Sequence, residues 1–158
     1  MSQSQTSTDR IEKQIRLSAP RARVWRALTD PQEFGQWFGV KLSGTVAPGA
    51  KLRGPMNSSC GHEDVTFEAT VETVEPEQRY AFRWHPYAIE PGVDYSSEPT
   101  TLIVFTLEDV AGGTLLTVVE SGFDKIPASR RVKAFEMNSH GWAIQLENIK
   151  RHLAGIRH

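Results

Sequence analysis

The sequence predicts an α+β fold, with a curved antiparallel sheet of about six to seven strands wrapped around one long C-terminal helix. Two patterns support this prediction. Between residues 129 and 157, six apolar side chains follow one another at spacings of seven, four, three, four and three, the periodicity of a helix with ~3.6 residues per turn. The middle of the chain alternates apolar and polar residues between turn signals, as antiparallel strands with one buried face do. No second helical pattern is as long, so the apolar stripe is expected to cover the sheet.

The first part of the chain is predicted to form one strand and two short helices. Residues 1–9 are polar apart from Met1 and are expected to be a disordered tail, followed by a single domain over residues 10–158. Residues 11–17 alternate loosely and suit a strand. Ser18 is expected to cap the first helix, and the Asp30-Pro31 pair ends that helix and begins the second.

The middle of the chain is predicted to be a series of hairpins. Glycine and proline recur after residue 39 and predict short strands at residues 40–42 and 50–53. Residues 65–72 and 80–85 alternate cleanly and predict two more strands, followed by a loop at residues 86–99. The last two strands, at residues 103–107 and 116–120, are joined by a turn at Gly112-Gly113.

The C-terminal helix has recognisable ends. Pro127 suits the first helical position, and the basic residues Lys150, Arg151 and His152 suit the negative end of the helix dipole. Gly155 can end the helix. The apolar stripe consists of Phe135, Trp142, Leu146, Ile149, Leu153 and Ile156.

The composition excludes several classes of protein. A formal net charge of -1, from 18 basic and 19 acidic residues, gives no electrostatic basis for binding nucleic acid. Cys60 is the only cysteine, so an intrachain disulfide is impossible and a cytoplasmic location is expected. The first residues lack the apolar core of a signal peptide, and no apolar run reaches the ~18 residues of a membrane span, so membrane insertion is not expected.

Several strings resemble the START-like, or SRPBCC, superfamily. They are residues 19–31 (APRARVWRALTDP) with Trp37-Phe38, residues 113–123 (GTLLTVVESGF), and Asn138 to Trp142 with Leu146. Together they are similar to the AHSA-type branch, named for its homology to the activator of a heat-shock chaperone's ATPase, over about residues 11–154. The resemblance implies a Bet v 1-like helix-grip fold with a cavity between the helix and the sheet. Members of the superfamily bind lipids, sterols, polyketides or hormones, act as cyclases, or assist chaperones, so the fold alone does not select a function.

Two polar residues are predicted to face the cavity. Strand alternation puts Glu120 on the same face as Val118, toward the helix, where burial would raise the pKa of its carboxyl group. The alternative is a carboxylate at the strand end that is solvated or held by a backbone amide. Asn138 falls within the apolar sector of the helix near Trp142, where it either offers a hydrogen bond inside the cavity or bonds to neighbouring backbone. These two interpretations of Asn138 stay open.

Other residues carry weaker expectations. Gly141 indicates close packing of another element more often than space for a ligand. Met137 and Ile144 lie on the outer side of the helix, where they mark either a contact with a second subunit, hence a homodimer, or merely an apolar spot, and the second interpretation is favoured. The residues Cys60, His62, Glu63 and Asp64 are metal-ligand types, but they lack a second ligand pair, so a polar loop at the cavity mouth is favoured over a metal site.

The sequence therefore predicts a protein that binds a small hydrophobic molecule, with no cofactor, metal or catalytic residue assigned. Alternatives are a chaperone-associated role through the outer surface and an enzyme that uses Glu120 as acid or base; a role without catalysis is favoured. The predicted ligand-binding residues are Trp37, Phe38, Phe67, Phe82, Trp84, Phe105, Val118, Glu120, Phe123, Phe135, Asn138 and Trp142.

Overall fold

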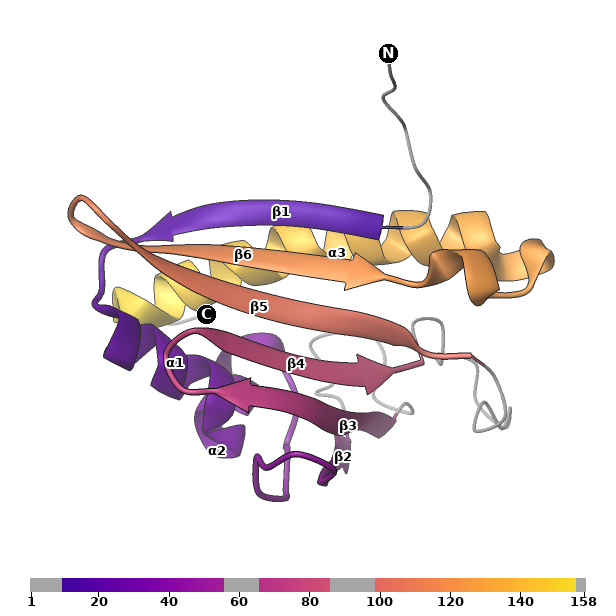
Figure 1. Cartoon of the computed structure of the whole chain (residues 1–158), viewed down its shortest axis with the longest axis horizontal. Coiled ribbons are helices and arrows are strands. Elements are labelled where there is room, and N and C mark those ends of the chain that lie inside the picture. Colours follow the sequence, from indigo (N-terminus) through magenta and orange to yellow (C-terminus); the bar gives the residue numbers. More distant parts are fainter. Residues whose placement is uncertain (1–9, 56–65, 86–98, 156–158) are drawn as a thin grey trace, which may run out of the picture.

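The computed structural model describes residues 10–55, 66–85 and 99–155. Six antiparallel strands form one sheet in the order β1-β6-β5-β4-β3-β2 (Figure 1). The α+β class and the strand number predicted from the sequence are confirmed. The strands are β1 (Arg10–Leu17), β2 (Lys51–Pro55), β3 (Thr66–Glu75), β4 (Arg79–Trp84), β5 (Thr101–Val110) and β6 (Gly113–Ser121).

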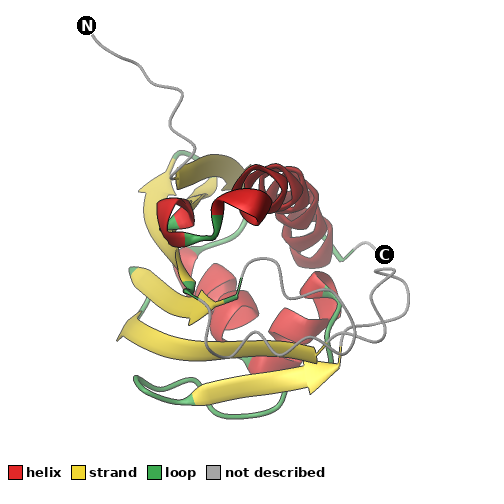
Figure 2. Cartoon of the chain, turned by 90° about the vertical axis from the view of Figure 1, so that its right-hand side faces the viewer, coloured by secondary structure: helices red, strands yellow, loops and turns green. Residues whose placement is uncertain are grey.

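Three α-helices lie on the same face of this sheet. They are α1 (Arg21–Thr29), α2 (Pro31–Phe38) and α3 (Ala128–Leu153), with a short 3-10 helix at Phe123–Lys125. Figure 2 shows the sheet curving around the space that the helices occupy. The long helix α3 therefore covers the concave face, as predicted from its apolar stripe.

The ends of the helices follow local sequence signals. Asp30 caps α2, because its side chain accepts a hydrogen bond from the backbone N–H of Gln32 at 3.1 Å, and Pro31 takes the first helical position. The helix α3 begins one residue earlier than predicted, with Pro127 as its N-cap, and it ends four residues earlier, where Gly155 adopts a left-handed φ of 79°.

Two local predictions were wrong. Ser18 does not cap α1, because the extended Pro20 is the N-cap and it makes no side-chain capping bond. Residues 40–42 form no regular strand: Val40 and Ser43 are isolated bridge residues, Ser43 bridges Arg53, and the N–H of Lys41 donates to the carbonyl of Pro55 at 3.1 Å. The predicted strand at residues 50–53 is confirmed as β2.

The strand alternation was predicted correctly where the structure describes it. Phe67, Ala69 and Val71 of β3 are buried, and so are Ile103 and its inward neighbours on β5. These residues form one core with the inner faces of α1, α2 and α3. The predictions for the tail at 1–9, for Val65, for the loop at 86–98 and for Ile156 concern positions outside the described residues.

Within the described ranges, no helix is both long enough and apolar enough to cross a membrane.

Candidate functional site

The carboxylate of Glu120 lies at the centre of the candidate site. Glu120 is on β6, paired with Ile11 of β1 and Ile103 of β5, and its exposed fraction is 0%. Its neighbours on the same face, Leu116 and Val118, are also fully buried. The sequence prediction that Glu120 points toward the helix is confirmed, and a solvated carboxylate is excluded.

Four side chains donate hydrogen bonds to Glu120. The indole nitrogens of Trp84 and Trp142 lie 2.8 and 2.7 Å from its oxygens, and the hydroxyl of Thr101 lies 2.5 Å from Oε2. The amide nitrogen of Asn138 is 3.1 Å from Oε1 and 3.0 Å from Oε2. These donors come from β4, β5 and α3, so this one carboxylate joins the helix to the middle of the sheet.

Two opposing effects act on the acidity of Glu120. Burial away from water raises its pKa, and the four hydrogen bonds lower it by stabilising the anion; the burial effect is larger, so the pKa is raised. The indole N–H groups and the amide N–H of Asn138 that contact Glu120 can only donate, so the hydroxyl oxygen of Thr101 is the contacting atom that can accept a hydrogen bond from the protonated acid. A proton on this carboxyl group would therefore lie on Oε2, between Glu120 and Thr101.

Aromatic rings surround the carboxylate. The indoles of Trp84 and Trp142 are stacked, with centroids 5.8 Å apart and planes inclined by 29°. Phe38 of α2 lies 6.1 Å from each of these tryptophans, and Phe67 of β3 lies 5.6 Å from Trp84. The ring of Phe105 lies 5.7 Å from Trp142. We call Phe38, Phe67, Phe82, Trp84, Phe105 and Trp142 the aromatic cluster.

The remaining predicted ligand-binding residues lie around this cluster. Val118 pairs with Phe105 across the sheet and is fully buried. Trp37 is buried as well, but its indole N–H donates to the carbonyl of Ala27 at 2.8 Å, which joins α1 to α2. Phe123 and Phe135 form a separate pair at 5.3 Å. The structure thus groups most of the predicted set around Glu120 and places Trp37, Phe123 and Phe135 at its margins.

Gly141 differs from its expected role. A Cβ built on this residue has no heavy atom of the described residues within 4 Å. Close packing therefore does not explain the glycine, and the alternative, space beside α3, agrees with the structure. Of the outer pair, Ile144 is 48% exposed, whereas Met137 is partly buried against the core, contrary to prediction.

A second buried acid was missed by the sequence analysis. Glu33 of α2 pairs with Arg23 and with Arg26 (3.1 Å) of α1, and with His152 near the end of α3 (2.9 Å). Burial acts to raise the pKa of Glu33, but the bonds to His152 and the two arginines outweigh it and the pKa is lowered. His152 is separated from Glu33 by 119 positions, so no local pattern reveals the contact.

The predicted polar loop with Cys60, His62, Glu63 and Asp64 lies outside the described residues. Within the described part of the chain, no three His, Cys, Asp or Glu side chains are grouped to hold a metal ion.

Comparison with known proteins gives a consistent result. Residues 18–154 match the family described as activator of Hsp90 ATPase homolog 1-like protein. No curated protein matches the chain. The resemblance drawn from the sequence strings is confirmed.

Solved structures share the fold. DynU16, a putative protein in the dynemicin biosynthetic locus, is 30% identical with a TM-score of 0.70, covering 92% of this chain and 47% of that one; this chain spans about half of DynU16. Protein NE0264 from Nitrosomonas europaea is 19% identical with a TM-score of 0.74, and the match covers 97% of this chain and 99% of NE0264. The Aha1 dimer from Colwellia psychrerythraea is 19% identical with a TM-score of 0.65, and the match covers 91% of this chain and 95% of the Aha1 chain.

Proposed function

Because the chain belongs to the family of proteins like the activator of Hsp90 ATPase homolog 1, which has the helix-grip architecture described above, we propose that it binds a small hydrophobic molecule between α3 and the sheet. The ligand lies against the aromatic cluster, on the side of α3 where Gly141 leaves space. Trp84 is the member of the cluster that is only partly buried, so its indole is the surface that the ligand covers.

The observation that carries this proposal is the set of hydrogen bonds to Glu120. Its carboxylate accepts bonds from both Trp84 and Trp142 and so fixes their stacked indoles. A binding wall that is already ordered loses little conformational entropy when a ligand arrives. Glu120 and Asn138 therefore act by positioning the aromatic wall, since Asn138 bonds to Glu120 and Glu120 bonds to both tryptophans.

The first test is native mass spectrometry of protein purified from its own host, followed by release and identification of any bound molecule. Replacing Gly141 with leucine fills the space beside α3, and we expect this variant to lose the ligand. Ala143→Leu is the matched control, because Ala143 is exposed on the same helix. Bare wild-type protein that is not thermally stabilised by a panel of lipophilic compounds would contradict the proposal.

A chaperone-associated role is the second candidate, and the description of the matching family supports it. Such a role would use the outer surface, where Val132 (58% exposed) and Ile144 (48%) present apolar side chains on α3. Binding to the Hsp90 of the host should then be lost in Ile144→Asp and retained in Gly141→Leu. The reverse result would favour the cavity.

Three finer expectations belong with this proposal. A homodimer gains support from the Aha1 dimer, which is similar in fold, and sedimentation at micromolar concentration tests it. A cytoplasmic location rests on the single cysteine. Acid–base catalysis by Glu120 gains less support, because its hydrogen-bonding neighbours are protein donors; turnover of a bound ligand that is lost in Glu120→Gln would establish it.

A further inference from the structure

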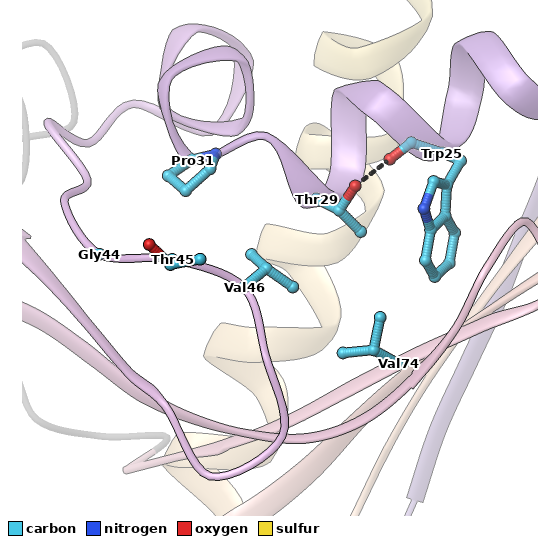
Figure 3. Close-up of a pocket in the computed structure, with 7 residues that line it drawn as sticks. All are labelled: Trp25, Thr29, Pro31, Gly44, Thr45, Val46 and Val74. Carbon is cyan, nitrogen blue, oxygen red and sulfur yellow. Dashed lines mark hydrogen bonds between the residues drawn. The ribbon is translucent and has the colours of Figure 1, made fainter.

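We propose a second ligand site, beside β3 and separated from Glu120 of β6 by the strands β5 and β4, for a small uncharged molecule with an aromatic or branched body and one hydrogen-bond acceptor. A pocket of about 330 Å³ lies where α1, α2, the loop at residues 44–46 and β3 meet (Figure 3). Its volume is at the lower end of the ~300–1,000 Å³ range of small-molecule pockets.

A β-bulge builds one wall of this pocket. The pairing of β3 with β4 shifts between Val71 and Thr73, so Val71 lies opposite Phe82 and Val74 lies opposite Tyr80. The extra residue brings Val74 to the inner face, the face occupied by Val71, where simple alternation would turn it outward. The side chain of Val74 therefore lines the pocket instead of facing solvent.

A layer of aromatic rings separates the pocket from the aromatic cluster. Trp25 of α1 packs edge-to-face on Tyr80 at 6.3 Å, and Tyr80 in turn contacts Phe82 at 5.6 Å and Phe105 at 6.2 Å. Tyr80 is 2% exposed. A ligand beside Trp25 therefore does not reach Glu120 or the stacked tryptophans.

The wall formed by the loop is fixed by backbone contacts. Ser43 and Arg53 exchange backbone hydrogen bonds of 2.8 and 3.2 Å, and Gly49 donates to the carbonyl of Val71 at 2.8 Å. Gly44 approaches β2 so closely that a Cβ would lie 2.9 Å from the carbonyl oxygen of Lys51. The pocket is therefore formed before a ligand binds.

The lining selects an uncharged ligand. Among the described residues, the lining contains no acidic or basic side chain, and Trp25, Pro31, Val46 and Val74 supply apolar surface. Thr29 already donates its hydroxyl to the carbonyl of Trp25 at 2.8 Å. No described residue accepts a hydrogen bond from the indole N–H of Trp25, and Figure 3 shows the nitrogen edge of this ring on the side of Thr29 and Val46. A carbonyl oxygen of the ligand would accept that bond.

Acetophenone is a suitable probe because it combines one ring with one carbonyl, and the full-length protein labelled with ¹⁵N reports where it binds. We expect saturable shifts of the Trp25 indole N–H and of the Val46 and Val74 amides, with a dissociation constant on the order of 1 mM. Benzoate, which carries a charge on the same ring, should bind at least about tenfold more weakly.

Two substitutions test the contacts. Val46→Phe fills the pocket from the loop and should abolish binding, whereas Val132→Phe on the exposed face of α3 is the matched control and should not. Trp25→Phe keeps a ring but removes the N–H, and we expect about fivefold weaker binding.

These experiments distinguish binding at the second site from binding at the aromatic cluster, on which the proposed function rests. Gly141→Leu should leave acetophenone binding at Trp25 unchanged. Shifts confined to the indoles of Trp84 and Trp142, no saturable shift at all, equal binding of benzoate, or wild-type binding by Val46→Phe would each overturn the second site.

Discussion

Two buried carboxylates hold α3 in place, and they do so by different means. Glu120, near the middle of α3, accepts hydrogen bonds from the uncharged side chains of Trp84, Thr101, Asn138 and Trp142, and its pKa is raised. Glu33, near the C-terminal end of α3, pairs with two arginines and His152, and its pKa is lowered. Neutral donors orient side chains without placing a positive charge in the core, whereas arginines at the margin compensate the charge itself.

This difference between the two carboxylates predicts that substitution of Glu120 has the largest effect on stability. Glu120→Ala leaves four donors, three of them buried, without an acceptor, and we expect the free energy of unfolding in urea to fall by ~3–5 kcal/mol. Glu108→Ala, which removes an exposed carboxylate from β5, is the control and should change it by less than about 0.5 kcal/mol. Equal effects of the two substitutions would show that the Glu120 hydrogen bonds contribute nothing net.

Substitutions of two tryptophans compare a hydrogen bond to a charged acceptor with a hydrogen bond to a neutral acceptor. Trp142→Phe removes a donor to the Glu120 carboxylate, and Trp37→Phe removes a donor to the carbonyl of Ala27. Both residues are buried, at 3% and 2% exposed, so the loss of ring volume is similar. We expect the first substitution to cost about 1 kcal/mol more than the second in equilibrium unfolding at pH 8. Equal costs would argue that Glu120 is neutral at that pH.

Substitution of Glu33 should lower the stability less, because its two arginine partners are closer to water. The side chain of Arg26 is 64% exposed and that of Arg23 is 32% exposed. Glu33→Gln should therefore lower the free energy of unfolding by about 1 kcal/mol, and less at high salt. Asp109→Asn is the matched control, since Asp109 is 73% exposed in its pair with Arg21. A salt-independent loss would contradict the ionic nature of the Glu33 contacts.

The two acids should also respond to pH with opposite signs. The folded pKa of Glu33 lies below the reference value of 4.5, so its contribution to stability is present above pH 4.5 and is lost as pH falls through the folded pKa. The folded pKa of Glu120 lies above 4.5, so stability falls as pH rises from 4.5 through that folded value. Urea unfolding from pH 3 to 8 checks both: Glu33→Gln should remove the loss at low pH, and Glu120→Gln should remove the fall above pH 4.5. Slopes of the same sign would refute the assignment.

The parts of the site that the sequence predicted depend on periodicity within one element. Alternation along β6 turned Glu120 inward, and the helical angle between Asn138 and Trp142 placed both on the inner face of α3. Their distances of 3.0 and 2.7 Å from Glu120 confirm this. Such patterns are strong because a one-residue shift would expose every apolar side chain of the strand.

The parts that the sequence did not predict depend on contacts between elements. Trp84 and Thr101 meet Glu120 because of the register between β4, β5 and β6, and no single strand contains that information. The contact of Glu33 with His152 depends on how α2 meets α3. The bulge that turns Val74 inward interrupts an alternation that is otherwise regular, so periodicity alone misplaces that residue.

The pairing of β1 with β6 determines when the sheet can be completed during synthesis. Arg10 of β1 pairs with Ser121, and Leu17 pairs with Thr114, so of the six described strands the first to be synthesised pairs with the last. At a translation rate of ~5–20 residues per second, β1 waits roughly 5 to 20 s for its partner. The strands β2 to β5 pair only with neighbours in the chain and can form hairpins during that interval. While β1 is unpaired, the charges of Arg10, Glu12 and Arg16 alternate with its apolar residues and oppose association with other nascent chains.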